Sequence, residues 1–177
     1  MTEKKTLPKT RKYEIFVWLF YTYVLRKIPY SFGVKLRNGY ARKHLKCFGK
    51  FPTISTNVRL LSPNTIAIGS NVGVARDVTL DGRGNIEIGD FTIIGFESVL
   101  LTSTHNYSDK EIPISKQGMY SKPVKIGKGC WIGARVIVLP GVEIGDGCII
   151  GANAVVTKNV PQNCVAAGVP ARVIKER

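Results

Sequence analysis

Residues 126–160, IGKGCWIGARVIVLPGVEIGDGCIIGANAVVTKNV, repeat with a period of six residues. An aliphatic residue stands at every sixth position, and a small residue stands four positions after each of them. The aliphatic set is Ile126, Ile132, Val138, Ile144, Ile150 and Val156, and the small set is Cys130, Val136, Val142, Cys148, Ala154 and Val160. Side chains two apart on a strand share a face, so both sets are expected to point inward. The repeat predicts a parallel β-helix with triangular coils of three six-residue sides.

The segment from Ile54 to Leu100 follows the same repeat less regularly, with steps of 6, 8, 6, 6, 8, 6 and 6 residues. Its inward aliphatic residues are Ile54, Leu60, Ile68, Val74, Leu80, Ile88, Ile94 and Leu100, with Val58, Val72, Val78, Thr92 and Ser98 at the small positions. Both steps of eight follow the third side of a coil, so their extra residues are expected to bulge at one corner. Turn-forming residues, SPN at 62–64 and DGRG at 81–84, fill these two bulges.

The next step, from Leu100 to Ile126, spans 26 residues and leaves from the same corner. It predicts an extruded, structureless loop over residues 106–123 that begins just after His105. A loop of this length inside a compact repeat domain usually has a function. Counting also places Asp81 and Arg83 one coil from His105, where they are expected to line the same cleft.

The sequence therefore predicts an all-β protein. Residues 51–177 are expected to form a parallel β-helix of about five triangular coils with a C-terminal tail. A basic, aromatic-rich helical segment over residues 1–50 precedes it. The length of 177 residues suits one domain of ordinary size, and 44% hydrophobic residues are typical of a folded chain. Four cysteines without a CxxC pair do not predict a disulfide scaffold. Cys130 and Cys148 are expected to stack as reduced core thiols, as in a cytoplasmic protein.

The formal net charge of +14 is concentrated in residues 1–50, which hold 13 lysines and arginines against two acidic residues. The apolar run 15–25 would form about 16 Å of helix, too short for a bilayer core of about 30 Å. No small-residue cleavage motif follows it, so a signal peptide is not expected. Two interpretations stay open: the helix lies on the inner face of a membrane near anionic lipids, or it packs on the β-helix or a neighbouring subunit.

A second basic helix is predicted over residues 34–50, where His44 is expected to be a surface or packing residue. No nucleic-acid-binding motif accompanies these charges, so nucleic acid is not an expected partner.

Four stretches of this chain resemble the left-handed β-helix acyltransferases, especially the sugar O-acetyltransferases that include galactoside, maltose and capsule-polysaccharide acetyltransferases. They are His105 with its loop, VKIGKGCWIGARV at 124–136, PGVEIGDGCIIGANAVVTK at 140–158 and AGVPARVI at 167–174. The resemblance covers residues 50–177. It implies a left-handed coil, although physics favours right-handed crossovers between parallel strands. It also implies acetyl-CoA as the donor and a homotrimer whose active sites lie between subunits.

The resemblance assigns His105, the only histidine of the β-helix portion, as the catalytic base. Transfer of an acetyl group from a thioester to a hydroxyl needs a base for the hydroxyl proton and a site for the tetrahedral oxyanion. An imidazole with an unperturbed pKa of about 6.5 is mostly neutral near pH 7 and can accept that proton.

The donor site is expected along a column of small residues. Ala134 and Ala152 are 18 residues apart, so they should lie one above the other and leave a groove for a pantetheine arm. The resemblance implies that coenzyme A is contacted by Trp131, Ala134, Ala152, Thr157, Lys158, Arg172 and Lys175. In this prediction a backbone N–H near Ala134 stabilises the oxyanion. Lys158, Arg172 and Lys175 bind the nucleotide phosphates.

The acceptor site departs from the pattern of the galactoside enzymes. Ala75 stands where an acceptor-binding asparagine is found in that family, and the basic N-terminal segment replaces a region that holds an acidic acceptor residue. The departures favour a polysaccharide or lipid-linked glycan, with Asp77, Asp81, Arg83 and Tyr107 as candidate acceptor-binding residues.

The fold alone does not dictate function, and three alternatives have to be considered. A zinc carbonic anhydrase of the same fold needs several histidines per site, and this chain has two in all, so no metal is expected. N-acetylation of an amino-sugar nucleotide would use the same donor. A non-enzymatic β-solenoid binding module would need neither His105 nor the loop.

Overall fold

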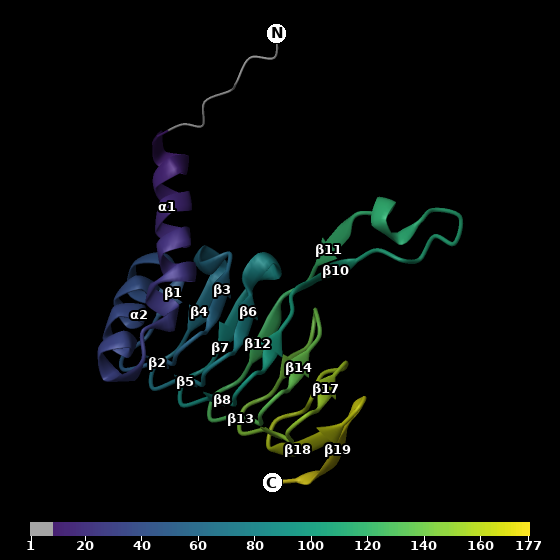
Figure 1. Cartoon of the computed structure of the whole chain (residues 1–177). Helices are drawn as coiled ribbons and strands as arrows, with labels where there is room; N and C mark the ends of the chain where they lie inside the picture. The colour runs from purple at the N-terminus through teal and green to yellow at the C-terminus, as the bar shows by residue number, and fades with distance from the viewer. Residues whose placement is uncertain (1–8) are drawn as a thin grey trace.

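The computed structural model describes residues 9–177, which form two N-terminal helices and a three-sided coil of parallel strands (Figure 1). Residues 1–8 of the predicted N-terminal segment lie outside the described residues. The first sheet contains β1 (Cys47–Phe48), β4 (Ile66–Ile68), β7 (Ile86–Ile88), β12 (Val124–Ile126) and β15 (Glu143–Ile144). The third contains β3 (Arg59–Leu61), β6 (Thr79–Asp81), β9 (Val99–Leu100), β14 (Ile137–Val138) and β17 (Val155–Val156).

The second sheet is the longest and ends in an antiparallel pair. It contains β2 (Thr53–Ile54), β5 (Gly73–Val74), β8 (Ile93–Ile94), β13 (Trp131–Ile132), β16 (Ile149–Ile150), β18 (Cys164–Gly168) and β19 (Ala171–Glu176). The strands from β2 to β18 are parallel, and β19 turns back to pair antiparallel with β18. The predicted β-helix of about five coils is therefore confirmed, and it matches the left-handed β-helix acetyltransferases.

The core contains every inward residue that the six-residue count predicts. All aliphatic and small positions from Ile54 to Val160 are buried. Matching residues stack at consecutive coils, as where Leu80 pairs with Leu100 and Ile132 with Ile150. Cys130 and Cys148 are buried free thiols, and burial raises the pKa of both. The coil is thus stabilised by a continuous apolar column rather than by a cross-link between these two residues.

Two corners of the coil turn tightly, whereas the third is open. The corner between the second and third sheets, residues 55–57, 75–77, 95–97, 133–135 and 151–153, is called the alanine corner. Its last position has positive φ in each coil, at Asn57, Asp77, Glu97, Arg135 and Asn153. The corner between the third and first sheets is called the hairpin corner and comprises residues 62–65, 82–85, 101–123, 139–142 and 157–159.

All three predicted bulges leave from the hairpin corner, and they stack on one another. η2 (Pro63–Thr65) and η3 (Gly82–Gly84) are joined where Thr65 Oγ1 donates to the Gly82 carbonyl. The third bulge contains β10 (Ser103–His105), η4 (Ile114–Lys116) and β11 (Met119–Ser121). The prediction of a structureless loop is wrong at its base, because β10 and β11 pair antiparallel and form a projecting hairpin (Figure 1).

The N-terminal helices cover the first coil, and their boundaries differ from the prediction. α1 (Lys9–Tyr23) and η1 (Leu25–Lys27) are followed by α2 (Tyr30–His44). The second helix was expected over residues 34–50, but its C-terminal part is replaced by β1, whose residues pair with Ala67 and Ile68 of β4. Backbone pairing with an existing strand thus outweighs the helical pattern of this short segment, and the coil begins at Cys47.

Two buried polar side chains fasten these helices. Tyr21 of α1 donates its hydroxyl to the Val58 carbonyl at 3.0 Å and stacks on Tyr40 of α2. Arg37 of α2 is 0% exposed and donates to the carbonyls of Ile54, Leu25 and Ile28 at 2.9, 3.2 and 2.6 Å. The arginine therefore connects α2, η1 and the first coil.

Candidate active site

His105 is the last residue of β10, at the root of the hairpin. Its backbone pairs with Met119 of β11, and the next residue, Asn106, donates its amide N–H to Gly118 and its side-chain amide to Gln117. The imidazole is exposed to solvent. A ligand hydroxyl can therefore approach a histidine whose backbone is held by a regular ladder.

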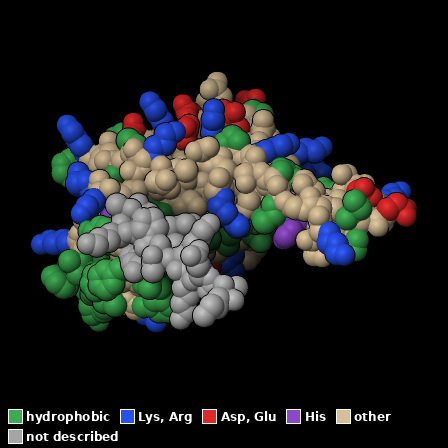
Figure 2. All heavy atoms as spheres, turned by 90° about the horizontal axis from the view of Figure 1, so that it is seen from above, with side chains coloured by type: hydrophobic (Ala, Val, Ile, Leu, Met, Phe, Trp, Pro, Cys, Tyr) green, Lys and Arg blue, Asp and Glu red, His purple; other side chains and the backbone are tan. Residues whose placement is uncertain are grey.

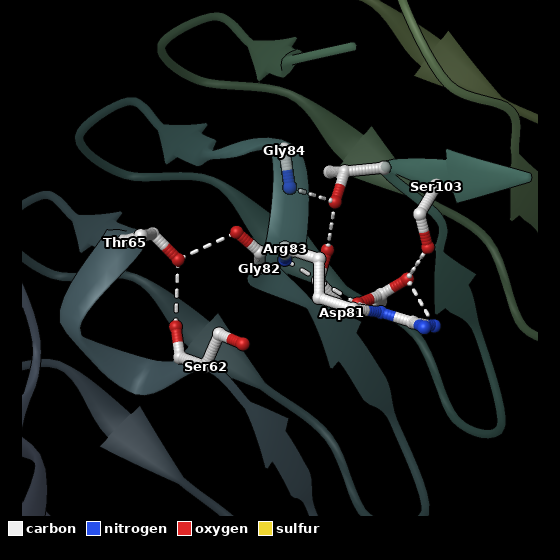
Figure 3. Close-up of polar contacts among 8 residues, drawn as sticks. Ser62, Thr65, Asp81, Gly82, Arg83, Gly84 and Ser103 are labelled. Atoms are coloured by element: carbon white, nitrogen blue, oxygen red, sulfur yellow. Dashed lines mark hydrogen bonds and ion pairs between the residues drawn. The ribbon is translucent and has the colours of Figure 1, made fainter. Parts of the chain in front are cut away.

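A buried carboxylate lies directly beneath this root (Figure 3). Asp81 is 0% exposed and accepts hydrogen bonds from Ser103 Oγ at 2.9 Å and from Arg83 Nε at 2.8 Å and Nη2 at 3.0 Å. Its main-chain carbonyl accepts from Thr102 Oγ1, which in turn accepts from Gly84 N at 2.7 Å. Ser103 begins β10 two residues before His105, so this network anchors the strand that bears the imidazole.

The ionisation of Asp81 agrees with its structural surroundings. Burial raises the pKa of this carboxyl group, but hydrogen bonds from Arg83 and Ser103 outweigh burial and hold the pKa below its usual value. The hydrogen bond to Asp81 correspondingly raises the pKa of Arg83. Asp81 was expected to line the acceptor cleft. Its carboxylate is instead enclosed and occupied, whereas the side chain of Arg83 is about half exposed (49%).

Replacing Asp81 with asparagine is expected to lower the free energy of unfolding by about 1–3 kcal/mol at pH 7. The half-exposed Arg83 can turn to water, which limits the loss. Because the folded pKa lies below the unfolded one, the wild-type carboxylate stabilises the fold fully above about pH 4 and loses this effect as pH falls through the folded value.

Thermal melts of both proteins at neutral and acid pH measure this effect. The gap between wild type and the asparagine variant should narrow below pH 4. Glu97→Gln is the matched control, because Glu97 makes an exposed ion pair with Arg135 at 3.1 Å and should contribute under about 1 kcal/mol. Equal melting of wild type and Asp81→Asn at pH 7 would contradict the proposed anchoring.

The predicted alanine column lies at the alanine corner. Ala134 follows β13 and Ala152 follows β16, and the equivalent positions of the two preceding coils hold Phe96 and Arg76. The guanidinium of Arg76 lies over the Phe96 ring at 5.3 Å. A hollow of about 200 Å³ lies here, lined by Arg76, Phe96, Glu97, Ala134, Arg135 and Asn153, whereas Ala152 does not line it.

Successive coils approach closely at this corner. A Cβ atom at Gly95 would lie 2.7 Å from the nitrogen of Ala134, and one at Gly133 would lie 2.6 Å from the nitrogen of Ala152, so only glycine fits at both places. Within residues 9–177, the N–H of Ala134 donates no hydrogen bond. The groove therefore offers an unpaired main-chain donor of the kind that stabilises an oxyanion.

The other donor candidates are exposed, but they are divided between places. Trp131 points outward from the second sheet, and Arg172 and Lys175 lie on β19 at the end of that sheet. Thr157 and Lys158 follow β17 and belong to the hairpin corner. The structure therefore does not gather the whole set on one surface of a single chain.

The acceptor candidates are divided in the same way. Arg83 and the exposed Tyr107 lie at the hairpin corner with His105, whereas Asp77 lies at the alanine corner and accepts a hydrogen bond from Asn57. Ala75 is at the alanine corner too. Within one chain the base and the donor groove thus occupy different corners of the triangle.

Thr102 and Ser103 link the buried carboxylate to the hairpin and are not among the residues predicted from the sequence. The hydroxyl run 102–104 directly before His105 was the available signal. Among residues 9–177, no group of three or more histidine, cysteine or acidic side chains is arranged to hold a metal ion.

Comparisons with known proteins agree with the fold. The family model "Bacterial transferase hexapeptide (six repeats)" matches residues 123–158. The chain is 39% identical to galactoside O-acetyltransferase of Escherichia coli K12 over 71% of its own length and 64% of that protein. It is 37% identical to the putative colanic acid biosynthesis acetyltransferase WcaF of the same organism, over 73% of this chain and 68% of that protein.

One solved structure is also closely similar. It is a galactoside acetyltransferase in complex with coenzyme A, with a TM-score of 0.81 and 32% identity over 99% of this chain and 84% of that chain.

Proposed function

Because this chain belongs to the hexapeptide-repeat acetyltransferases, we propose that it transfers the acetyl group of acetyl-CoA to a hydroxyl of a cell-surface glycan during polysaccharide synthesis. The observation that carries this proposal is the exposed His105 at the root of the hairpin, above a buried network that fixes it. The substrate class and the role in polysaccharide synthesis rest on similarity to the two relatives above. The chain spans 64% of the length of the galactoside O-acetyltransferase and 68% of the length of WcaF.

In the proposed reaction His105 accepts the proton of the acceptor hydroxyl while the hydroxyl oxygen attacks the thioester carbonyl. The N–H of Ala134 donates to the oxyanion of the tetrahedral intermediate. The carbon–sulfur bond then breaks, and the CoA thiolate leaves with the proton that His105 returns. No covalent enzyme intermediate is needed, because the thioester is already activated.

Two copies of the chain are required for this reaction, since the base and the donor groove occupy different corners. A homotrimer places the hairpin corner of each subunit beside the alanine corner of the next. Arg83 and Tyr107 then contact the acceptor from one subunit, while Asp77 does so from its neighbour. Trp131, Ala134 and Ala152 hold the acyl end of acetyl-CoA, and Thr157, Lys158, Arg172 and Lys175 hold the nucleotide end.

The test is an assay of acetyl transfer from acetyl-CoA to a panel of glycans. The reaction is monitored by the release of the CoA thiol, and the product is identified by mass spectrometry. Hydroxyl acceptors should be acetylated on oxygen, and mild alkali should remove the acetyl group because it forms an ester. Amino-sugar nucleotides are included in the panel, because a product acetylated only on nitrogen would replace this proposal with N-acetyltransfer. Sedimentation should give three copies per particle.

We also place the protein on the cytoplasmic side of the membrane, where residues 1–50 make peripheral contact. Within residues 9–177 no helix is long and apolar enough to cross a bilayer. However, α1 exposes large apolar side chains on the face opposite to the buried Tyr21, namely Ile15, Phe16, Leu19, Phe20 and Tyr23. Figure 2 shows hydrophobic side chains gathered at one end of the molecule with lysine and arginine around them. Such a surface suits the interface of an anionic bilayer.

The intact protein is expected to cosediment with phosphatidylglycerol vesicles at low salt and to be released as salt rises. Phe16→Ser with Phe20→Ser should abolish binding, because both side chains enter the interface. Phe91→Ser is the matched control, since Phe91 is as exposed as Phe16 (65% each) but lies on the coil. Deleting residues 1–50 should abolish binding too, although it also removes Arg37 from the core. An intact protein that ignores these vesicles would end the membrane proposal.

A further inference from the structure

A cavity of about 310 Å³ opens between α1, α2 and η2, away from His105 and the alanine corner. It is called the helix pocket here and is lined by Tyr13, Val17, Trp18, Tyr40, His44, Pro63 and Asn64. Its volume lies near the lower limit of small-ligand sites, so it suits a compact ligand. None of the residues assigned to the donor or acceptor lines it.

The lining combines flat aromatic rings with a few polar groups. Tyr40 is stacked on Tyr21, with ring centroids 4.2 Å apart, and makes a tilted contact with the ring of His44 at 4.4 Å. Trp18 is 40% exposed and lines the cavity. Aromatic rings with polar edges accommodate ligands that have both an apolar face and hydroxyl groups, as a sugar ring does.

The polar groups of the helix pocket suit a neutral ligand. Burial, together with the neighbouring Lys43, lowers the pKa of His44, so at pH 7 its ring is neutral and has one donor and one acceptor nitrogen. The amide of Asn64 likewise both donates and accepts. Among the described side chains that line the cavity, none is a lysine, an arginine or a carboxylate.

The helix pocket lies on the edge that leads to His105. Pro63 and Asn64 belong to η2, which is bonded to η3 through Thr65 and Gly82, and η3 is bonded to the hairpin root through Gly84 and Thr102. In Figure 1, α1 and the hairpin rise from the same side of the coil. Coils repeat at about 4.8 Å, so two coils separate η2 from the hairpin root by about 10 Å. A glycan of a few sugar units covers such a distance.

We propose that the helix pocket is a second sugar subsite, which binds a unit of the acceptor glycan other than the unit that is acetylated beside His105. This inference rests on the proposed acetyl transfer and narrows its acceptor to an oligosaccharide or polysaccharide. The helix pocket uses the α1 face that turns toward α2, whereas the membrane contact uses the opposite face. Both contacts can therefore exist at once.

The first test is direct binding, read from Trp18. The chain has two tryptophans, so in a Trp131→Phe protein Trp18 is the only reporter of fluorescence. The probes are malto-oligosaccharides and β-1,4-galacto-oligosaccharides of one to four units. We expect Trp18 emission to change on titration with the sugars of at least one series. The dissociation constant should fall by about tenfold from the monosaccharide to the tetrasaccharide. No change with any of these sugars, or a response to phosphatidylglycerol vesicles alone, would overturn the proposal.

The second test is kinetic and uses the full-length protein with acetyl-CoA. Trp18→Ala should raise KM for the tetrasaccharide by about tenfold, while kcat and the KM for the monosaccharide stay unchanged. Trp18→Phe should recover most of the affinity. Phe91→Ala, which removes an exposed aromatic ring from the coil, should leave both KM values unchanged.

The outcomes separate this inference from the proposed function. Acetyl transfer with equal KM for short and long acceptors in wild type would leave the function standing and overturn the subsite. Conversely, sugar-dependent Trp18 emission without any acetyl transfer would support the subsite and overturn the function.

Discussion

Replacing His105 with alanine is expected to lower kcat for acetyl transfer by about 10²–10⁴-fold, the usual contribution of a general base. The fold should survive, because the imidazole is exposed and the hairpin is held by backbone pairs and by Ser103. Affinity for CoA should change little, since His105 does not line the donor groove and is not among the residues proposed to hold the cofactor. Initial rates with acetyl-CoA and the accepted glycan, together with a thermal shift by CoA, measure the two effects separately.

Tyr107→Phe is the control for this experiment. Tyr107 lies two residues further along the same hairpin and is also exposed, so its substitution disturbs the loop to a similar degree without removing the base. We expect its kcat to stay within about tenfold of wild type. A His105→Ala protein that retains wild-type kcat would show that another group accepts the proton, and the proposed mechanism would fall.

Replacing Arg37 with alanine is expected to destabilise the protein by about 3–5 kcal/mol. The side chain is fully buried, and its removal leaves a cavity and deprives the carbonyls of Ile54, Leu25 and Ile28 of their donor. Burial lowers the pKa of Arg37, and its Nη2 atom has no hydrogen-bond partner among the described residues. Denaturant unfolding measures the loss.

Arg42→Ala is the matched control on the same helix. Arg42 is exposed and lies over the Phe48 ring at 5.6 Å, so its loss should cost under about 1 kcal/mol. Arg37→Lys should retain part of the stability, because an ammonium group can still donate to one or two of the carbonyls. If Arg37→Ala unfolds at the same denaturant concentration as wild type, the helices are not fastened to the coil in the way described.

Counting by sixes predicted the coil well because each inward position has one geometric requirement. A residue such as Ile132 or Leu80 must be apolar and must fit the layer above, so its pattern is visible in the sequence. The stacking of the bulges at one corner followed from the same count. The common origin of η2, η3 and the hairpin is therefore a result that the sequence could supply.

The six-residue repeat does not predict the direction of a side chain where the backbone leaves the coil. Asp81 was placed correctly beside the hairpin, but its carboxylate points inward to Ser103, and only the three-dimensional arrangement of 81–83 and 103 reveals this. The pairing of β10 with β11 was missed because residues 103–105 and 119–121 are joined by long-range register rather than by a local repeat.

The predicted C-terminal boundary of the second helix was wrong for a related reason. Residues 45–50 include Cys47, Phe48 and Gly49, which are poor helix formers, and β4 offers Cys47 and Phe48 an unpaired backbone edge. A partner 20 residues away thus decided the conformation. The helix pocket has the same origin, since α1, α2 and η2 are brought together by packing on the first coil.

The two ends of the stacked strands bear on solubility. A parallel ladder has no intrinsic length limit, so an exposed terminal coil invites another molecule to add on, edge against edge, and to grow a fibre. Here α2 covers β1 and β2 at one end. At the other end β19 reverses direction, and its exposed Arg172, Lys175 and Glu176 put charge on the final strand. Neutralising those charges would be expected to promote filament growth, even though no contact of the folded interior would be lost.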